Sequence, residues 1–461
     1  MNLLFALVTI SMIRLDFRYY LYLMIVKLDI MMITRRGLLK TIGLTTFGLP
    51  TIDVSAICPG EEIMDSPFDL PAREDPKFWS KVRDQYMLNT DTVFFNPGTF
   101  GAMPKIVVDK MVENLRNTAM NVADWDYKDD NTAQVISGYQ ALMFIRTKVG
   151  KILNCDPKYI AMTDNVTNGM SYIANGITLQ PGDEIITSNQ EHGGGKSSWV
   201  LKEKRSGVVY KEFALPKPIH DGAEVLDIIT KSFTSRTKVL MLSHMISGSG
   251  AILPMKEICD EARERGIFTI VDGAQCLGHI KVDIGDIGCD AYVGCFHKWI
   301  GAPAGTGFMY IQPDKMKDIW STVASGNWNN HEDEGYRFTQ RGTGNFSVIA
   351  GLDAALDFHL ALGPEKVYGR IKFLGDRLRE GLRRTNKVKI FSPVDNTMCA
   401  GITVYNIEGW TGARLQDEFW SRARMRPRAS GAEFGVRHCT HIFNSEEEID
   451  KALNIVKQLA G

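Results

Sequence analysis

The sequence predicts an α/β fold with a mostly parallel sheet. From about residue 155 to 312, short apolar runs rich in β-forming residues alternate with polar or Gly-rich turns and amphipathic stretches. Such alternation is typical of strands joined by helices that cover the sheet. The predicted strands cover residues 159–162, 184–187, 239–242, 268–271, 291–293 and 307–311. Residues 256–266 predict a helix between two of these strands, and the final glycine ends it.

The composition narrows the class of protein. The chain has 461 residues, 44% of them hydrophobic, and a formal net charge of -1. This length favours two domains over one. The near-neutral balance lacks the basic surface that binds nucleic acid, so we expect no nucleic-acid partner. The eight cysteines are scattered without a C-x-x-C pair, and we expect neither a metal site nor a disulfide framework.

The N-terminus carries the pattern of an export signal. Residues 34–40 read TRRGLLK, a weakly hydrophobic stretch follows, and Val54-Ser55-Ala56 suits signal peptidase. This segment resembles a twin-arginine signal, which predicts a leader over residues 1–56 and a periplasmic or secreted protein. The alternative is a basic, disordered leader on a cytoplasmic protein. Charged residues interrupt the apolar residues 1–30, so we expect no stable membrane span.

Polar residues gather where the predicted strands end. Five such loops cover residues 164–169, 191–193, 243–244, 272–275 and 297–298. In open α/β sheets, ligands bind beyond the carboxyl ends of the strands. We therefore expect one ligand site at this edge of the sheet.

Two residues in these loops indicate the ligand. Lys298 precedes a turn rich in Gly, Ala and Pro, and a lysine in such a pocket is the type that forms a Schiff base with an aldehyde. Asp272 ends the buried run at 268–271, where its carboxylate can pair with a pyridinium N–H. Pyridoxal 5′-phosphate (PLP) needs both groups. Taken alone, Lys298 is better interpreted as a solvated loop lysine and Asp272 as a helix cap.

PLP also needs a phosphate cradle and a group over the face of its ring. Asn165, Val166 and Thr167 precede a predicted helix start, where backbone N–H groups and a Thr hydroxyl suit a phosphate, although an ordinary N-cap has the same geometry. His192 follows a strand end, and its flat ring can stack on the pyridine. A lone histidine is usually structural or exposed, so this role depends on the whole set of residues.

The motifs resemble those of a known family. VDGAQ at 271–275 followed by HKW at 297–299 resembles the class V aminotransferase-like superfamily of PLP fold type I. The APAGTG run at 302–307 looks most like the isopenicillin N epimerase-like branch. The resemblance implies an aspartate aminotransferase-like large domain with a mostly parallel seven-stranded sheet and a smaller C-terminal α/β domain.

These features give the predicted domain organisation. After the leader, an N-terminal arm covers residues 57–95, the PLP-binding large domain residues 96–335 and the small C-terminal domain residues 336–461.

The resemblance also implies roles for the cofactor-binding residues. Asp272 lies at the ring nitrogen, Gln275 at the phenolic oxygen and His297 near the phosphate, with His192 stacked on the ring. In the family, a Gly-Thr pair from a neighbouring subunit completes the phosphate site. Gly342-Thr343 match that pair, which implies a homodimer with shared active sites.

Two segments are implied to contact the substrate. VRHCTHIFN at 436–444 resembles the segment whose arginine clamps the substrate α-carboxylate, and Arg437 takes that role. The alternative is a surface arginine. The segment FNPGTFG at 95–101, which includes Asn96, resembles a family pattern that lines the pocket.

The sequence departs from its relatives at three places. Cys295 stands where relatives often have a Ser or Thr that binds the phosphate, so we expect a weaker contact. Ser247 stands where cysteine desulfurases have an Asn near the ring oxygen. Those enzymes also need a nucleophilic cysteine on a loop that corresponds to residues 422–435, and this loop has none. Desulfuration is therefore disfavoured.

The predicted site acts at the Cα of an amino-acid substrate. Lys298 serves as the general base for the Cα proton, Asp272 stabilises the charge that develops in the ring, and His192 completes the catalytic set. Return of the proton leads to epimerisation or transamination, and these are the reactions that we expect. Loss of a β-substituent would instead give C–S or other β-eliminating lyase activity, which stays open as an alternative. An inactive PLP-fold binding protein is the non-enzymatic alternative.

Overall fold

The computed structural model describes residues 70–72, 74–124, 141–340 and 342–461. The predicted export signal and leader at 1–56 lie outside the described residues, as does the first part of the predicted arm, residues 57–69. Localisation therefore stays a prediction.

A seven-stranded sheet in the order β2-β8-β7-β6-β5-β3-β4 forms the centre of the structure. Its strands are β2 (Ile160–Thr163), β3 (Glu184–Ser188), β4 (Val209–Phe213), β5 (Thr237–Ser243), β6 (Phe268–Asp272), β7 (Ala291–Cys295) and β8 (Gly307–Ile311). All neighbouring pairs from β4 to β7 are parallel, and β8 is antiparallel to both of its neighbours. The predicted mostly parallel, seven-stranded sheet is confirmed.

Helices cover both faces of this sheet. Leu240 and Leu242 of β5 join the core that includes α9 residues such as Ile258, whereas Val239 and Met241 join the core on the opposite face. Side chains that alternate between two cores require a strand buried on both faces, as parallel strands are. Burial on both faces also explains why the runs that predicted these strands are almost continuously apolar.

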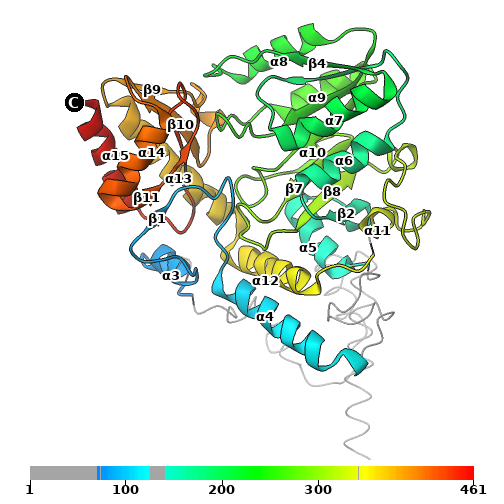
Figure 1. Cartoon of the computed structure of the whole chain (residues 1–461), viewed down its shortest axis with the longest axis horizontal. Helices are drawn as coiled ribbons and strands as arrows, with labels where there is room; N and C mark the ends of the chain where they lie inside the picture. The colour runs from blue at the N-terminus through cyan, green and yellow to red at the C-terminus, as the bar shows by residue number, and fades with distance from the viewer. Residues whose placement is uncertain (1–69, 73, 125–140, 341) are drawn as a thin grey trace, which may run out of the picture. The chain divides into compact units, whose positions relative to one another are not determined.

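Among the described residues, three helices of this part precede the first strand of the sheet and the others come after it, and α4 lies beside α12 (Figure 1). They are α3 (Phe78–Asp84), α4 (Lys105–Met120), α5 (Met143–Leu153), α6 (Val166–Gly176), α7 (Gly193–Ser206), α8 (Gly222–Ser232), α9 (Met255–Glu264), α10 (Ile284–Ile287), α11 (Glu334–Thr339) and α12 (Phe346–Leu362). Short 3-10 helices are η2 (Val122–Asp124), η3 (Pro157–Tyr159), η4 (Met316–Asp318) and η5 (Asn396–Met398). The predicted helix at 256–266 corresponds to α9.

A second, antiparallel sheet in the order β12-β13-β10-β9 lies in the C-terminal part of the chain. Its strands are β9 (Val388–Ile390), β10 (Ile402–Ile407), β12 (Arg428–Ala429) and β13 (Val436–Cys439), with α13 (Pro364–Arg383), α14 (Gly412–Ala423) and α15 (Glu446–Ala460) beside them. A short parallel pair, β1 (Val93–Phe94) and β11 (Met425–Arg426), joins the N-terminal segment to this part. Both larger sheets lie within one compact unit, Ser66–Gly461, and the predicted domain boundaries stay predictions.

The described part of the chain has neither a single membrane-spanning helix nor a cluster of metal-ligating side chains. No single helix there is long and apolar enough to cross a membrane, and only the bent pair α12 and α13 meets those criteria together. Within the same residues, no group of three or more His, Cys, Asp or Glu side chains could hold a metal ion.

Five histidines are buried in the fold, and burial keeps them neutral. It lowers the pKa of His244, His359 and His441 to about 4, and that of His279 and His438 to about 3. Unfolded histidines bind a proton near pH 6.5, so the unfolded state binds more protons below that pH. The free energy of unfolding must therefore decrease as the pH falls through this window.

His438 gives a direct test of this pH dependence. Neither ring nitrogen has a hydrogen-bond partner, and the ring packs among Phe95, Tyr405 and Phe419. We expect His438→Phe to raise the free energy of unfolding relative to wild type, with a margin that grows by up to about 1.4 kcal/mol per pH unit below pH 6.5. Urea unfolding at a series of pH values measures the margin. The exposed His220→Phe variant is the control, and a margin that does not change with pH would contradict the assignment.

Candidate active site

A cavity of about 480 Å³ lies at the carboxyl edge of the large sheet. Ten of the predicted site residues line it: Asn165, Val166, Thr167, His192, Ser247, Asp272, Gln275, Cys295, His297 and Lys298. They come from the loops after five different strands. The register of the sheet explains their convergence, because Ser243 at the end of β5 pairs with Asp272, which pairs with Val293 near the end of β7.

Asp272 is a buried carboxylate that faces the cavity. Its Oδ1 accepts a hydrogen bond from the backbone N–H of Ala274 at 2.9 Å, and among the described residues no donor reaches its Oδ2. Burial raises the pKa of Asp272, whereas this N–H and the charges of Lys298 and His192 lower it. Gly195 lies so close that an added Cβ would be 2.8 Å from Oδ2. The free oxygen suits the N–H of a flat, protonated ring.

The start of α6 supplies the predicted phosphate site. Asn165 is the N-cap, and its side chain accepts from the backbone N–H of Asn168 at 2.9 Å. Val166 and Thr167 occupy the first turn, where backbone N–H groups have no partner within the helix. Their N–H groups and the positive end of the helix dipole suit an anion. The ordinary capping role and the cradle are therefore compatible.

Two histidines border the same space. Nδ1 of His192 accepts from the backbone N–H of Gly194 at 3.1 Å, which fixes the ring. Burial, and then the charge of Lys298, lowers the pKa of both His192 and His297. Nδ1 of His297 is buried without a hydrogen-bond partner, so the site contains an unused polar atom of the kind that a bound ligand satisfies.

Arg437 and Asn96 do not line the cavity but contact residues that do. The guanidinium of Arg437 donates from Nη1 to Oγ of Ser247 at 2.7 Å, and from Nη2 to Oδ1 of Asn96 at 3.0 Å and Oγ1 of Thr99 at 2.9 Å. All of these acceptors are neutral, and Nε has no partner. The positive charge of this buried side chain is therefore not balanced by a carboxylate.

Gln275 and Cys295 are both held by neighbouring groups. Gln275 donates from Nε2 to the carbonyl of Gly98 at 2.9 Å and accepts from the indole N–H of Trp299 at 2.9 Å. The Cys295 thiol lies 3.5 Å from the carbonyl of Ala274, and burial raises its pKa to about 11. Cys295 is thus a protonated thiol at neutral pH.

The predicted Gly342-Thr343 pair does not line this cavity. Gly342 has a φ of 86°, no atom lies within 4 Å of the position of an added Cβ, and Thr343 is exposed. The predicted role of the pair in a neighbouring subunit's site stays a prediction.

Several lining residues were not predicted from the sequence. Gly194 and Gly195 belong to a glycine run after His192, which lets the backbone approach Thr167 and Asp272. Arg428 of β12 also lines the cavity. The sequence signal for Arg428 is its position in the loop at 422–435, which precedes the segment that contains Arg437.

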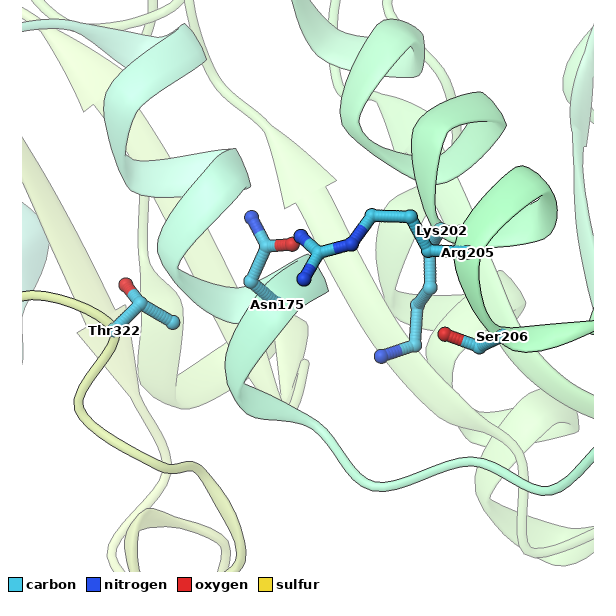
Figure 2. Close-up of a pocket in the computed structure, with 5 residues that line it drawn as sticks. All are labelled: Asn175, Lys202, Arg205, Ser206 and Thr322. Atoms are coloured by element: carbon cyan, nitrogen blue, oxygen red, sulfur yellow. The ribbon is translucent and has the colours of Figure 1, made fainter.

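A second cavity, of about 470 Å³, lies near the far end of α6 (Figure 2). It is lined by Asn175, Lys202, Arg205, Ser206 and Thr322. Lys202 donates from Nζ to the carbonyl of Ile177, the residue that follows α6, at 2.8 Å. This bond caps the helix C-terminus, where a cation is favoured, and gives the buried lysine a structural role.

The family model described as aminotransferase class V matches residues 92–419. The chain belongs to the class V aminotransferase family. This class V enzyme is therefore PLP-dependent, as predicted, and its cavity fits the cofactor: Lys298 for the aldehyde, the free oxygen of Asp272 for the ring, and the start of α6 for the phosphate.

Individual relatives differ in their activities. The chain is 27% identical over 401 residues to isopenicillin N epimerase from Streptomyces clavuligerus, covering 83% of this chain and 98% of the relative. It is 28% identical over 346 residues to a probable cysteine desulfurase from Xylella fastidiosa strain 9a5c, covering 68% and 80% respectively. The solved structure of the cystine C-S lyase C-DES with its product cysteine persulfide superposes with a TM-score of 0.70 at 24% identity, over 80% of this chain and 98% of the other. This likeness confirms the fold.

Gly101 positions the lysine of this class V enzyme. Its backbone N–H donates to the carbonyl of His297 at 2.8 Å, and an added Cβ would be 1.8 Å from the carbonyl oxygen of Lys298. Backbone atoms cannot move away cheaply, so we expect Gly101→Ala to displace Lys298 and weaken PLP binding by roughly tenfold or more, about 1.4 kcal/mol. Titration of the apoprotein with PLP, followed by visible absorbance, measures the affinity. Gly369→Ala, a helix position with no atom within 4 Å, is the control. Equal affinities in both variants would contradict this role.

Proposed function

We propose that this enzyme transfers the Cα proton of an amino-acid substrate, with epimerisation as its reaction and transamination as the other outcome of the same step. The observation that carries the proposal is the content of the cavity: a lysine, a buried carboxylate and a nearby unpaired guanidinium, without a reactive thiol. When bound, PLP supplies an electron sink for the charge left at Cα.

Each of these side chains has a defined task in the proposal. Arg437 binds the substrate α-carboxylate, and its contacts to Ser247, Asn96 and Thr99 fix the direction from which it does so. The amine of Lys298 removes the Cα proton and holds it for return. Asp272 keeps the ring nitrogen protonated, because its buried carboxylate is most stable beside a positive partner.

The thiols of the chain disfavour desulfurase chemistry. A desulfurase needs a thiolate that attacks the substrate sulfur, and thiolates form readily only when the pKa is low. The loop at 422–435 has no cysteine. Cys295 lines the cavity, but its pKa of about 11 keeps it protonated. At the same coverage of 98% of the relative, the chain is 27% identical to an isopenicillin N epimerase and 24% identical to a probable cysteine desulfurase, which favours the epimerase branch.

Isotope exchange tests the proposal. We expect the PLP-loaded enzyme, incubated with L- and D-amino acids in deuterated water, to incorporate deuterium at Cα with loss of optical purity. Lys298→Ala should lose exchange entirely, and borohydride should no longer fix the cofactor to that position. Lys196→Ala, whose side chain pairs with Glu212 away from the cavity, is the matched control.

The products discriminate among the reactions. A 2-oxo acid derived from the intact substrate would indicate transamination. Release of ammonia and pyruvate would indicate β-elimination, the lyase alternative, and would overturn the proposal. An absence of exchange with all substrates, despite bound PLP, would favour a binding protein.

We also propose that two copies share their active sites. The exposed Thr343 and the left-handed Gly342 lie outside the cavity of their own chain, which supports a role in the partner's phosphate site. Thr343→Ala should then weaken PLP binding, and mixing it with Lys298→Ala should form hybrid dimers that regain activity at one site. Failure of the mixture to regain activity, although hybrids form, would contradict sharing. Twin-arginine export is likewise a proposal, which N-terminal sequencing of exported protein tests.

A further inference from the structure

Two arginines lie directly opposite each other beside the cavity. β12 and β13 are antiparallel, and their register pairs Arg428 with Arg437. Residues opposite each other in such a ladder direct their side chains to the same face, with Cβ atoms about 4.5–5.5 Å apart. Like charges at these positions repel, so this arrangement is unfavourable for folding.

No acidic side chain offsets the repulsion in the described part of the chain. Arg437 donates only to neutral acceptors. Arg428 has no hydrogen bond or ion pair with any described residue, and burial together with the charge of Arg437 lowers its pKa. Asp272 is the one carboxylate among the described residues that line the cavity, and it faces the cofactor ring in the proposed function.

The two arginines differ in depth. Arg437 is buried, whereas Arg428 is exposed and lines the cavity directly. The charge of Arg428 acts on the pKa of His192, while the charged side chains that act on Asp272 are Lys298 and His192. Because Arg428 is exposed and lines the cavity whereas Arg437 is buried behind Ser247 and Thr99, Arg428 lies on the outer side of the cavity.

A bound anion would offset the repulsion between the guanidinium groups of Arg428 and Arg437. One carboxylate, adjacent to Cα, is assigned to the deeper Arg437. We propose that Arg428 binds a second anionic group, so that the substrate is an amino acid with a carboxylate or another acidic group in its side chain. This inference rests on the proposed function, since it assigns the α-carboxylate to Arg437.

The test compares ligands that differ only in side-chain charge. The PLP-loaded wild-type enzyme is titrated with aspartate and asparagine, glutamate and glutamine, and 2-aminoadipate and its side-chain amide, and the change in visible absorbance gives each apparent Kd. A charge-assisted contact predicts roughly tenfold or tighter binding of the acid at the chain length that reaches Arg428. Arg428→Gln should reduce this preference to about twofold or less without weakening the amide, and Arg428→Lys should restore part of it.

A neighbouring arginine provides the matched control. Arg426 packs over the ring of Trp420 at 4.1 Å and does not line the cavity. Arg426→Gln should keep the wild-type preference. Thermal unfolding of each variant shows whether it is folded.

Two results would overturn the proposal. If Arg428→Gln weakens the binding of the acid and of the amide equally, Arg428 binds the α-carboxylate and not a side-chain anion. If the wild type shows no preference for any acid, a second series of ligands is used. The binding of dicarboxylates from malonate to pimelate is compared with that of monocarboxylates of equal length, and the thermal shift of the protein measures the binding. Equal binding within that series would exclude the second anion site.

The outcomes also separate this inference from the proposed function. The dicarboxylates carry no amine and undergo no reaction. A charge preference that depends on Arg428 can therefore be established even if deuterium exchange fails. Conversely, exchange without any charge preference would leave the proposed function intact and remove this inference.

Discussion

The guanidinium of Arg437 joins the three parts of the chain on which the site depends. It extends from β13 of the C-terminal sheet and binds Ser247 in the loop after β5, and Asn96 and Thr99 in the N-terminal segment. In the same segment, the carbonyl of Gly98 accepts a hydrogen bond from the side chain of Gln275. Each hydrogen bond of Arg437 connects β13 to another part of the chain. The buried guanidinium of Arg437 and its neutral acceptors therefore hold this wall of the cavity in place.

A buried carboxylate secures the opposite wall. Glu191 accepts from the hydroxyl of Ser188 at the end of β3 and from the backbone N–H of Ser243 at the end of β5, at 2.6 and 2.9 Å. Burial raises its pKa to about 7, and the charge of Asp272 acts in the same direction. These bonds hold the ends of β3 and β5 together, and with them His192 and Asp272. The cavity therefore owes its shape to polar groups that lie behind the residues that contact a ligand.

The sequence predicted the elements whose residues are buried on both sides. The runs at 268–271 and 307–311 are mostly apolar because both faces of β6 and β8 are covered. β4, with the sequence VYKEF, was missed because it lies at the sheet edge and its exposed positions carry charge. Local motifs predicted Lys298, Asp272 and the start of α6 as site residues, since each lies at the carboxyl end of a strand or within three residues of it. Arg428 was missed because its position opposite Arg437 depends on pairing between strands, which no local pattern encodes.

The residues that line the cavity come from two different parts of the fold. Lys298, Asp272 and the start of α6 lie at the carboxyl edge of the large sheet, and their proposed roles serve any reaction of the cofactor. Other lining residues come from outside that sheet: Phe100 from the N-terminal segment and Arg428 from β12. In this chain that wall carries the guanidinium of Arg428, and the loop at 422–435 to which it belongs has no cysteine. Under the proposed roles of Arg437 and Arg428, the charge of this outer wall favours anionic substrates over sulfur transfer.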